Sequence, residues 1–484
     1  MENFNNRIAV AYGDGIGPEI MDSVIRILQT AEVNLAIDTI SVGAEQYRRN
    51  YDSGIPPSTF ETIKNNKILL KAPITTPQGK GYKSLNVTLR KTLALYANVR
   101  PVMAYHPFIA CNFPKMNLVI IRENEEDLYA GIEYRLTEQN YESLKLISRR
   151  GSEKINKFAF DYAKKHQRKK VSCFIKDNIM KFTDGTFHTV FKEVAKHYPE
   201  VANEQMIIDI ATGKLAAKPE QFDVIVTENL YGDIISDVAA EISGSVGLCG
   251  SANIGDKYAM FEAVHGSAPD IAGQNVANPT GLLNAAIMML NHIGYNEKAN
   301  LIQNALNYTI EQGLHTADLY NEETSSKQLG TKEFANAVMQ NLGQVPEHLS
   351  RLQDFSKLKQ ENKKIDLSNS ALNVKIRKLV GVDIYIDYNK QDFTDFSKKI
   401  NEITLEHSLN LQMISHKGLK IWPEQNYEHE LSDMLICRFV AKGIPKETSH
   451  PEIVALLTLL NEHKITFIKT ENLYLYDDKL GFSL

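Results

Sequence analysis

Short apolar runs alternate with amphipathic, helix-like stretches along the first two thirds of the chain. Residues 7–13 (RIAVAYG) predict a buried strand, and a glycine turn and Pro18 lead from it into an apolar helical pattern that ends near Leu28. Pro is favoured in the first turn of a helix because its fixed φ suits the helix. Further strands are predicted at 68–74, 116–123, 170–177, 205–211 and 222–230. Strands that alternate with helices in this way predict an α/β architecture.

The pattern breaks after the α/β part and then restarts. We interpret 346–373 as a linker, because 351–378 holds eight Lys/Arg and few large apolar residues. Beyond the linker, strands and helices are predicted in the order β-α-β-β-α-β, with a hairpin at 409–422. This order favours a small ferredoxin-like α+β domain at 374–484.

Length and composition limit the class of protein. The 484 residues exceed a single hydrophobic core, which stops growing at roughly 250–300 residues, so at least two domains are expected. A formal net charge of −5 gives no reason to expect nucleic acid or an anionic membrane as a partner. The four cysteines are far apart, which favours reduced thiols over a disulfide framework or a structural zinc site. With no membrane-spanning run and no leader pattern, we expect a cytoplasmic protein.

Arginines and small polar residues indicate an anion site. The segment SLNVTLR contains Ser84, Asn86 and Arg90, and Arg100 and Arg122 follow it. Guanidinium groups bind carboxylates through two parallel hydrogen bonds and stay charged. A single arginine is more often a solvated surface residue, so the cluster predicts a polycarboxylate site only if the fold brings its members together.

Three aspartates form a second cluster. Asp233 and Asp237 are four residues apart and share one face of a predicted helix, and Asp209 precedes them. Carboxylates without Cys or His partners suit Mg²⁺ or Mn²⁺ better than zinc. Acidic residues at the start of a helix are also favoured by the helix dipole alone, so the spacing does not decide between the two.

Tyr129 and Lys176 are candidates for proton transfer. Tyr can donate a proton, and Lys can act as a base once burial or nearby cations lower its pKa. The alternative is a core tyrosine with a satisfied hydroxyl and a surface lysine, and spacing alone does not exclude it.

Two glycine-containing segments could approach a dinucleotide. In the loop 261–281, Gly266 and Gly273 would let the backbone come close to a ligand. The N-terminal GDGIG turn lacks the GxGxxG spacing and the acidic residue about 20 positions later, so we predict a structural strand-to-helix turn there and no Rossmann site.

Taken together, seven segments resemble the β-decarboxylating dehydrogenase family of isocitrate and isopropylmalate dehydrogenases, and isocitrate dehydrogenases most closely. They are GDGIGPE (13–19), KAPITTPQGKGYKSLNVTLR (71–90), RPV (100–102), RENEEDLYAGIE (122–133), KDNIMKFTDG (176–185), NLYGDIISD (229–237) and HGSAPDIAGQNVANP (265–279). The resemblance implies a two-domain unit that is not a Rossmann fold. Its large α/β domain would comprise 1–96 and 245–345, and its small domain, with a dimer clasp, 97–244. The region 374–484 looks like the C-terminal extension that a minority of isocitrate dehydrogenases carry.

The activity that this resemblance implies is the metal-dependent oxidative decarboxylation of isocitrate to 2-oxoglutarate and CO₂, a step of the tricarboxylic acid cycle. The segment SLNVTLR favours isocitrate, since isopropylmalate enzymes place bulky apolar residues on this helix. A buried Ser-Asn pair without its carboxylate would cost roughly 1–3 kcal/mol per unsatisfied group.

The resemblance also implies roles for individual residues. Tyr129 would protonate the enol carbon, and Lys176, relayed through Asp233 or a water, would take the hydroxyl proton. The substrate would be bound by Ser84, Asn86, Arg90, Arg100 and Arg122. The metal, Mg²⁺ or Mn²⁺, would be held by Asp209, Asp233 and Asp237. In this family the positions of Lys176 and Asp209 are supplied by the partner subunit, so a homodimer or higher homo-oligomer with shared active sites is expected.

The cofactor is expected to be NAD, with NADP as the alternative. NADP-linked relatives place a Lys and then a Tyr after HGxAP, where this chain has Asp270 and Ile271. A carboxylate accepts hydrogen bonds from ribose hydroxyls and repels a 2′-phosphate; an unaligned basic residue such as Lys257 would be needed to offset this. The cofactor-binding residues implied are Thr76, Asn86, Glu262, His265, Gly266, Ser267, Ala268, Asp270, Ile271 and Asn278.

Two alternatives remain open at this point. A non-catalytic regulatory subunit of a heteromeric dehydrogenase would resemble the same family, although such relatives typically lose some of the catalytic residues that this chain retains. For the C-terminal domain we expect reinforcement of the dimer, and an allosteric ligand site is the second possibility. Binding of RNA is disfavoured, because 379–484 is acidic and its predicted strands lack paired exposed aromatic residues.

Overall fold

The computed structural model describes residues 6–49, 54–76, 84–349, 376–424, 428–442 and 447–483. Most of the predicted linker, 350–373, lies outside the described residues. The chain forms two compact units: the first comprises 1–130 and 145–365, and the second comprises 131–144 and 366–484.

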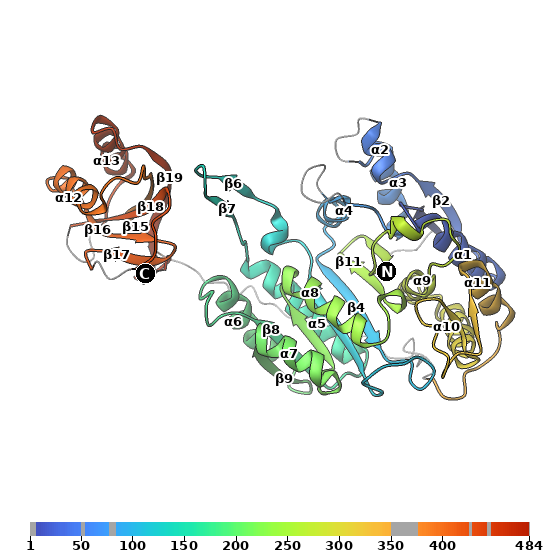
Figure 1. Cartoon of the computed structure of the whole chain (residues 1–484). Coiled ribbons are helices and arrows are strands. Elements are labelled where there is room, and N and C mark those ends of the chain that lie inside the picture. The colour runs from blue at the N-terminus through green and yellow to red at the C-terminus, as the bar shows by residue number, and fades with distance from the viewer. Residues whose placement is uncertain are drawn as a thin grey trace. The chain divides into compact units, whose positions relative to one another are not determined.

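A ten-stranded mixed sheet forms the centre of the first unit (Figure 1), in the order β2-β1-β3-β12-β11-β4-β5-β10-β8-β9. Antiparallel pairing joins β12, β11, β4 and β5, and the remaining neighbours are parallel. The strands are β1 (Arg7–Ala11), β2 (Ala36–Ile40), β3 (Ile68–Lys71), β4 (Ala97–Met103), β5 (Asn117–Glu123), β8 (Lys170–Ile175), β9 (Ala202–Ile207), β10 (Val224–Thr227), β11 (Gly250–Ile254) and β12 (Ala259–Ala263).

Helices pack against this sheet or against one another and bury their apolar sides. The longer ones are α1 (Gly17–Thr30), α3 (Pro57–Asn66), α4 (Leu85–Thr92), α5 (Arg149–Lys165), α6 (Thr183–Ala195), α7 (Ile208–Ala217), α8 (Asn229–Ile242), α9 (Thr280–His292), α10 (Asn296–Glu311) and α11 (Thr331–Gln340). A short helix α2 (Ala44–Arg48), two short paired strands, β13 (Leu314–Thr316) and β14 (Lys327–Leu329), and 3₁₀ turns that include η1 (Asp127–Ala130) and η4 (Pro269–Ile271) complete the unit.

The sheet order reflects the two predicted domains of the dehydrogenase unit. The five strands that come from 1–96 and 245–345 lie together, and the five strands from 97–244 lie together, with the β11–β4 pair between the halves. Both halves are part of one compact unit, so the predicted boundaries at 96 and 245 remain predictions.

The C-terminal domain confirms the ferredoxin-like prediction. Its sheet has the order β17-β16-β18-β15-β19-β20, in which the four strands β16-β18-β15-β19 have the ferredoxin-like arrangement and β17 and β20 extend the two edges. Its elements are β15 (Arg377–Asp387), α12 (Phe393–Thr404), β16 (Leu409–His416), β17 (Leu419–Trp422), β18 (Met434–Ala441), α13 (His450–Glu462), β19 (Phe467–Tyr476) and β20 (Lys479–Leu480). Apolar residues of both helices and of the sheet form its own core.

A hairpin from the middle of the chain belongs to this second unit. It consists of β6 (Glu133–Arg135) and β7 (Tyr141–Ser143). Asp433 accepts hydrogen bonds from Thr137 Oγ1 at 2.8 Å, from the Gln139 backbone N–H at 3.3 Å and from the Asn140 amide. The hairpin, which the sequence assigned to the small domain, is thus bound to the C-terminal domain.

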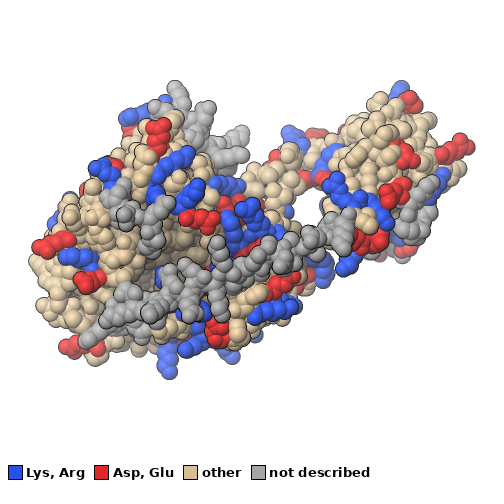
Figure 2. Space-filling view, turned by 180° about the vertical axis from the view of Figure 1, so that it is seen from behind, with Lys and Arg blue, Asp and Glu red and all other residues tan. Residues whose placement is uncertain are grey.

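The surface carries charges of both signs. Figure 2 shows basic and acidic side chains interspersed over one face, which agrees with the small net charge. All four cysteines are free thiols. In the described ranges, no helix combines the length and the apolar character needed to cross a membrane.

Candidate active site

Helix α4 presents the predicted substrate residues. Leu85 and Leu89, four residues apart, are fully buried in a core cluster and fix one face of the helix. Asn86 and Arg90 have the same spacing and therefore share a neighbouring face. Ser84 is the residue before the first helical turn, and the guanidinium of Arg90 is buried.

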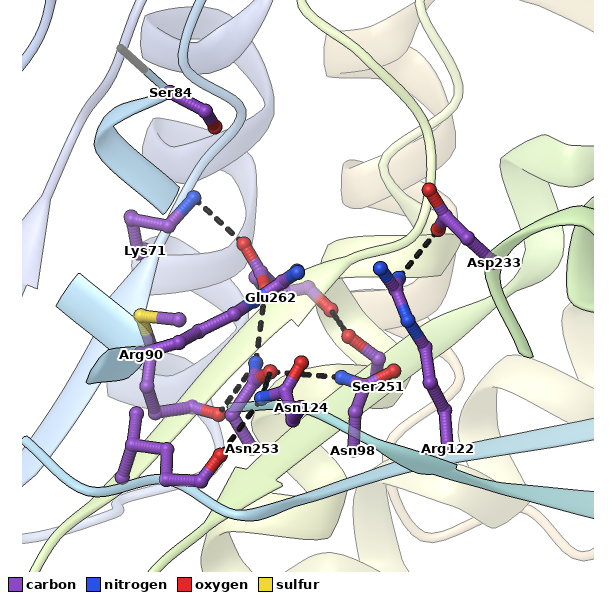
Figure 3. A network of polar contacts seen from close by, with 12 residues as sticks. Lys71, Ser84, Arg90, Asn98, Arg122, Asn124, Asp233, Ser251, Asn253 and Glu262 are labelled. Carbon is purple, nitrogen blue, oxygen red and sulfur yellow. Dashed lines mark hydrogen bonds and ion pairs between the residues drawn. The ribbon is translucent and has the colours of Figure 1, made fainter. Parts of the chain in front are cut away.

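A buried ionic network holds Arg90 (Figure 3). Glu262 on β12 accepts from Arg90 NH2 at 3.0 Å, and its other oxygen lies 2.7 Å from Lys71 Nζ. Asn253 Nδ2 donates to Glu262 Oε1 at 2.8 Å, and Asn253 Oδ1 accepts from Asn98 Nδ2 at 2.8 Å. Burial alone would raise the pKa of Glu262, but the cations of Lys71 and Arg90 outweigh it and hold the pKa well below its usual range. The carboxylate therefore stays charged and fixes Arg90 in place.

The other two arginines come from adjacent strands. Arg100 on β4 donates from Nε to Asn98 Oδ1 at 2.6 Å, and its NH2 lies 3.2 Å from Asp233 Oδ1. Arg122 on β5 donates from Nε and NH2 to Asn229 Oδ1 at 3.0 and 2.8 Å and forms an ion pair with Asp233.

Gly232 on α8 has no side chain, and this leaves room for the side chain of Arg122 beside the helix. A Cβ at position 232 would lie 2.5 Å from Arg122 Cγ, so a larger residue there would displace the arginine. Arg100 and Arg122 are both almost fully buried, and with Arg90 they form a cluster of three guanidinium groups around Asp233 and Glu262.

Tyr129 points at the same aspartate. Its hydroxyl donates to Asp233 Oδ2, and its ring lies 4.8 Å from the Arg122 guanidinium carbon. Burial raises the pKa of Tyr129, with a smaller contribution from Asp233. Burial would raise the pKa of Asp233 as well, but Arg122 and Arg100 outweigh it and lower the pKa. At neutral pH the pair is therefore a neutral tyrosine beside a carboxylate, which suits Tyr129 as a proton donor.

Lys176 and Asp209 form a separate pair. Lys176 Nζ donates to Asp209 Oδ2 at 2.8 Å, and the Asp209 side chain is 63% exposed. Among the described residues, no three His, Cys, Asp or Glu side chains lie close enough to hold a metal ion. Within one chain, the three predicted metal ligands are thus present as two groups, Asp209 alone and the pair Asp233 and Asp237 on α8.

Some buried polar atoms in the site have no hydrogen-bond partner in the described part of the chain. They are Asn86 Oδ1, Arg90 Nε and His265 Nε2. An unpaired polar atom in the interior costs about 1–3 kcal/mol. All three belong to residues predicted to bind substrate or cofactor, where a ligand would satisfy them.

The N-terminal glycine turn supports the predicted cofactor loop. The turn has no phosphate-binding pattern, and it joins β1 to α1 as expected. Gly15 has φ +60°, and a Cβ there would lie 1.9 Å from the carbonyl oxygen of Ser267, which accepts the Ile16 N–H at 2.9 Å. Ser267 Oγ is 2.7 Å from Thr75 Oγ1, next to Thr76. The turn thus holds the loop at Ser267.

Other predicted cofactor residues follow β12 along the same loop. His265 precedes Gly266, Ala268 has a left-handed backbone with φ 35°, and Asn278 donates to Asp318 at 3.0 Å. Asp270 is exposed and Ile271 half-buried in η4. Lys257 precedes β12, at the end of the strand opposite the loop. Glu262 differs from the rest, because both of its oxygens already bind Lys71, Arg90 and Asn253 within the protein.

Sequence reasoning missed the residues that position the arginines. They are Lys71, Asn98, Asn229, Ser236 and Asn253. A signal existed for Lys71, since a lysine that ends the apolar run ILLK of a central strand has to find a buried anion. The asparagines gave none, because nothing in the sequence marks a polar strand or helix residue as the partner of an arginine, whether it lies two residues away, as Asn98 does from Arg100, or 107 residues away, as Asn229 does from Arg122.

Comparison with known proteins identifies the family. Residues 7–338 match the family model described as isocitrate/isopropylmalate dehydrogenase. Residues 377–484 match the model described as bacterial isocitrate dehydrogenase, C-terminal domain. The second match confirms the expected C-terminal extension.

Individual relatives agree with this assignment. An isocitrate dehydrogenase [NADP] from Rickettsia felis is 57% identical over 99% of this chain and 98% of its own length. One from Thermus thermophilus is 39% identical over 100% and 96%. An Arabidopsis thaliana isocitrate dehydrogenase [NAD] catalytic subunit, mitochondrial, is 46% identical over 68% of this chain and 87% of its own.

Two solved structures are also similar. The crystal structure of the TT0538 protein from Thermus thermophilus superposes with a TM-score of 0.91 at 40% identity, covering 99% of this chain and 95% of the other. The isocitrate dehydrogenase from Methylococcus capsulatus superposes with a TM-score of 0.67 at 42% identity, covering 70% and 99%. This chain therefore belongs to the isocitrate/isopropylmalate dehydrogenase family and carries the C-terminal domain of the bacterial isocitrate dehydrogenases.

Proposed function

We propose that this protein oxidises and decarboxylates isocitrate to 2-oxoglutarate with reduction of NADP. The observation that carries the proposal is the cluster of Arg90, Arg100 and Arg122 beside the hydrogen-bonded pair of Tyr129 and Asp233. Isocitrate carries three carboxylates, and three guanidinium groups offer a matching set of donors. The names of the relatives that match over both domains point to the same reaction.

The substrate is expected to bind next to α4. Asn86 Oδ1 and Arg90 Nε are two buried atoms without a hydrogen-bond partner in the described structure, and the two residues are four apart, so they share one side of this helix. Arg90 Nε donates to a carboxylate, and the Asn86 amide can donate from Nδ2 as well as accept at Oδ1. Ser84 beside them adds a hydroxyl, so this end of the site suits a polar carboxylate better than an alkyl group.

A divalent cation fits the acidic groups. Asp233 and Asp237 present carboxylates from one face of α8, and Asp209 offers an exposed carboxylate to a neighbouring chain. An all-oxygen set suits Mg²⁺ or Mn²⁺. When bound, the cation would supply positive charge close to a developing enolate, and the nicotinamide would supply the hydride acceptor.

The protein's own residues supply the proton transfers. Lys176 accepts the proton of the substrate hydroxyl only as the neutral amine. Its Nζ lies 2.8 Å from Asp209, the proposed metal ligand, so the base and one metal ligand come together to the site. Tyr129 holds a proton at its hydroxyl and is poised to deliver it to the enol carbon. Arg100 and Arg122 keep Asp233 ionised while this proton moves.

NADP replaces NAD as the proposed cofactor. Asp270 and Ile271 favoured NAD, but the relatives that match both domains are named NADP enzymes. Asp270 is exposed, so solvent and salt screen its repulsion of a 2′-phosphate. Since Lys257 lies at the far end of β12, other basic residues have to contact the phosphate.

We also propose a homodimer with shared active sites. Large apolar side chains are exposed beside the separated residues of the site: Ile179 at 68%, Phe182 at 49%, Ile210 at 58% and Ile234 at 53%. Clustered exposed apolar residues mark an interface. A second chain that covers them would bring its Lys176 and Asp209 toward Asp233, and this arrangement is consistent with the separation of Asp209 from Asp233 and Asp237 among the described residues of one chain.

The test measures kcat/KM of the purified full-length chain for isocitrate with NADP and with NAD, each with Mg²⁺ and with EDTA, and with isopropylmalate as the control substrate. We expect turnover of isocitrate, a preference for NADP and loss of activity in EDTA. Preference for NAD would overturn the cofactor assignment alone. Absence of turnover with both cofactors would overturn the function and favour a regulatory subunit.

A further inference from the structure

A buried lysine outside the proposed chemistry lies between three acidic residues. Lys145 follows the β6–β7 hairpin, and its side chain is 13% exposed. Its Nζ lies 2.7 Å from Asp184 Oδ1 and 3.8 Å from Asp127 Oδ1, and it also donates to Glu228. The ring of Tyr231 lies 4.7 Å from the ammonium and covers one side of it.

Charge balance makes Lys145 essential to this cluster. The side chains of Asp127, Asp184 and Glu228 are at most 1% exposed, and a buried carboxylate needs a cation or several hydrogen bonds to be stable. One ammonium faces three acids. Burial raises the pKa of Glu228 to about 8, although Lys145 opposes this. Without Lys145, the buried acids would lose the ammonium that holds them together, and the segments that carry them would move apart.

The first of these acids holds the segment of the candidate base. Asp184 lies in the first turn of α6. Its Oδ1 binds Lys145, and its Oδ2 accepts the backbone N–H of Lys176 at 2.7 Å. A single carboxylate therefore connects the buried ammonium to the main chain of Lys176.

The other two acids hold the segments of the proton donor and the metal ligands. Asp127 begins η1, which contains Tyr129, and its Oδ2 accepts the Leu230 N–H at 2.7 Å in the first turn of α8. Glu228 is the residue that precedes α8. Helix α8 then carries Asp233 and Asp237, so both acids tie this helix to Lys145.

We propose that Lys145 is a positioning residue for the reaction. Its ammonium fixes the backbone of Lys176 relative to η1 and to the first turn of α8. In the proposed function, Lys176 serves the active site of a partner chain, whereas Tyr129 and Asp233 serve the active site of their own chain. Lys145 then connects the residues that one chain contributes to two different active sites. Only the kinetic test of this role rests on the proposed function, because it measures turnover of isocitrate.

Replacement of Lys145 by Ala, with chemical rescue, tests this role. The alanine lacks Cγ, Cδ, Cε and the ammonium of the lysine, and added propan-1-ammonium has the same three carbons and ammonium. We expect kcat to fall by about 10²-fold, the loss typical of a small misplacement of reacting groups. The KM for isocitrate should change little, because Glu262 holds Arg90 independently. Propan-1-ammonium should restore kcat in proportion to its occupancy, whereas tetramethylammonium, which has no N–H donor, should not.

Hydrogen exchange supplies a readout that does not depend on activity. The amides of Lys176 and Leu230 donate to Asp184 and Asp127, so both should exchange faster in Lys145→Ala and slow again with propan-1-ammonium. Should the wild-type chain not act on isocitrate, the proposed function fails, and these exchange rates still test the positioning role. Unchanged exchange at both amides would overturn it.

Two further variants exclude a general loss of stability as the cause. Lys154→Ala is the matched control, since Lys154 is a lysine on the neighbouring helix α5 that pairs with Asp256 at 3.7 Å outside the cluster; its kcat should stay near wild type. If Lys145→Ala does not fold, Asp184→Asn keeps the side-chain volume and leaves a single acceptor oxygen, which cannot bind both the Lys145 ammonium and the Lys176 N–H as the carboxylate does. Its kcat should fall with little change in KM, and a kcat equal to that of the wild type would overturn the inference.

Discussion

Lys71 and Glu262 form a buried ion pair, with 2.7 Å between Nζ and Oε2, between two neighbouring strands of the central sheet. The same carboxylate binds Arg90 and Asn253, and through Asn253 it reaches Asn98 beside Arg100. The pair thus anchors a chain of polar contacts that ends at Arg90 and Arg100, two of the proposed substrate-binding arginines. A change at Glu262 should affect both folding and substrate binding.

Glu262→Gln should lower the free energy of unfolding by about 3–5 kcal/mol, because it leaves the ammonium of Lys71 buried without its counter-ion. It should also raise the KM for isocitrate, since Arg90 loses the partner that orients it. Urea unfolding measures the first effect and steady-state kinetics the second. The control is Glu45→Gln, which removes an exposed ion pair with Arg49 and should cost no more than about 1 kcal/mol. Equal losses in the two variants would contradict the buried-pair argument.

Acid should destabilise the wild-type protein partly through Glu262. Its pKa in the folded protein lies well below the ordinary value of 4.5, because Lys71 and Arg90 outweigh the effect of burial. A carboxyl with a lowered folded pKa stabilises the protein fully above its unfolded pKa, and this stability is lost as the pH falls below it. The range from about pH 5 to about pH 3 brackets the pKa of a glutamate in the unfolded chain. As the pH falls through this range, the free energy of unfolding should therefore decrease less steeply in Glu262→Gln than in wild type. Parallel slopes in denaturant titrations at these pH values would argue against this contribution.

Tyr129→Phe should keep isocitrate binding and lose about 10²–10⁴-fold in kcat, the usual contribution of a general acid. The ring still packs on the guanidinium of Arg122, and only the hydroxyl, the proposed proton donor to the enol carbon, is lost. Steady-state kinetics with saturating cofactor give kcat and KM separately. Tyr134→Phe, at an exposed tyrosine of the β6–β7 hairpin, is the control and should behave as wild type. An unchanged kcat in Tyr129→Phe would remove Tyr129 from the mechanism.

The sequence predicted the elements that are marked by continuous apolar runs, such as β3, β5 and β10, or by helical periodicity, and whose order is simple. The alternation of apolar runs and helices was enough for the α/β unit and for the ferredoxin-like C-terminal domain. The site residues came from motifs in family order, and the structure brings Arg90, Arg100, Arg122, Tyr129 and Asp233 together.

Contacts between distant segments could not be predicted, since local patterns carry no signal for them. Asn98 and Asn253 look like ordinary polar positions in strands, yet they bind each other across 155 residues and support the arginines. Lys145 looks like a surface lysine after a turn, and its three acidic partners lie in three other segments. The binding of the β6–β7 hairpin to the C-terminal domain joins Thr137 to Asp433, which are 296 residues apart.

Asp433→Ala should loosen this hairpin without unfolding the C-terminal domain. The variant removes the acceptor of Thr137, Gln139 and Asn140, and leaves the ion pair of Lys469 with Glu142 as the main polar attachment. Hydrogen bonds to a charged group contribute about 1.5–3 kcal/mol each, so the hairpin amides should exchange at least tenfold faster. Hydrogen exchange of residues 131–144 measures this. The control is Asp478→Ala, which removes an exposed ion pair to Lys378 in the same domain.

If the C-terminal domain reinforces a dimer through this hairpin, Asp433→Ala should also raise the dimer dissociation constant in sedimentation experiments. Faster hairpin exchange with unchanged dimerisation would separate the two roles and favour a ligand-binding role for the domain.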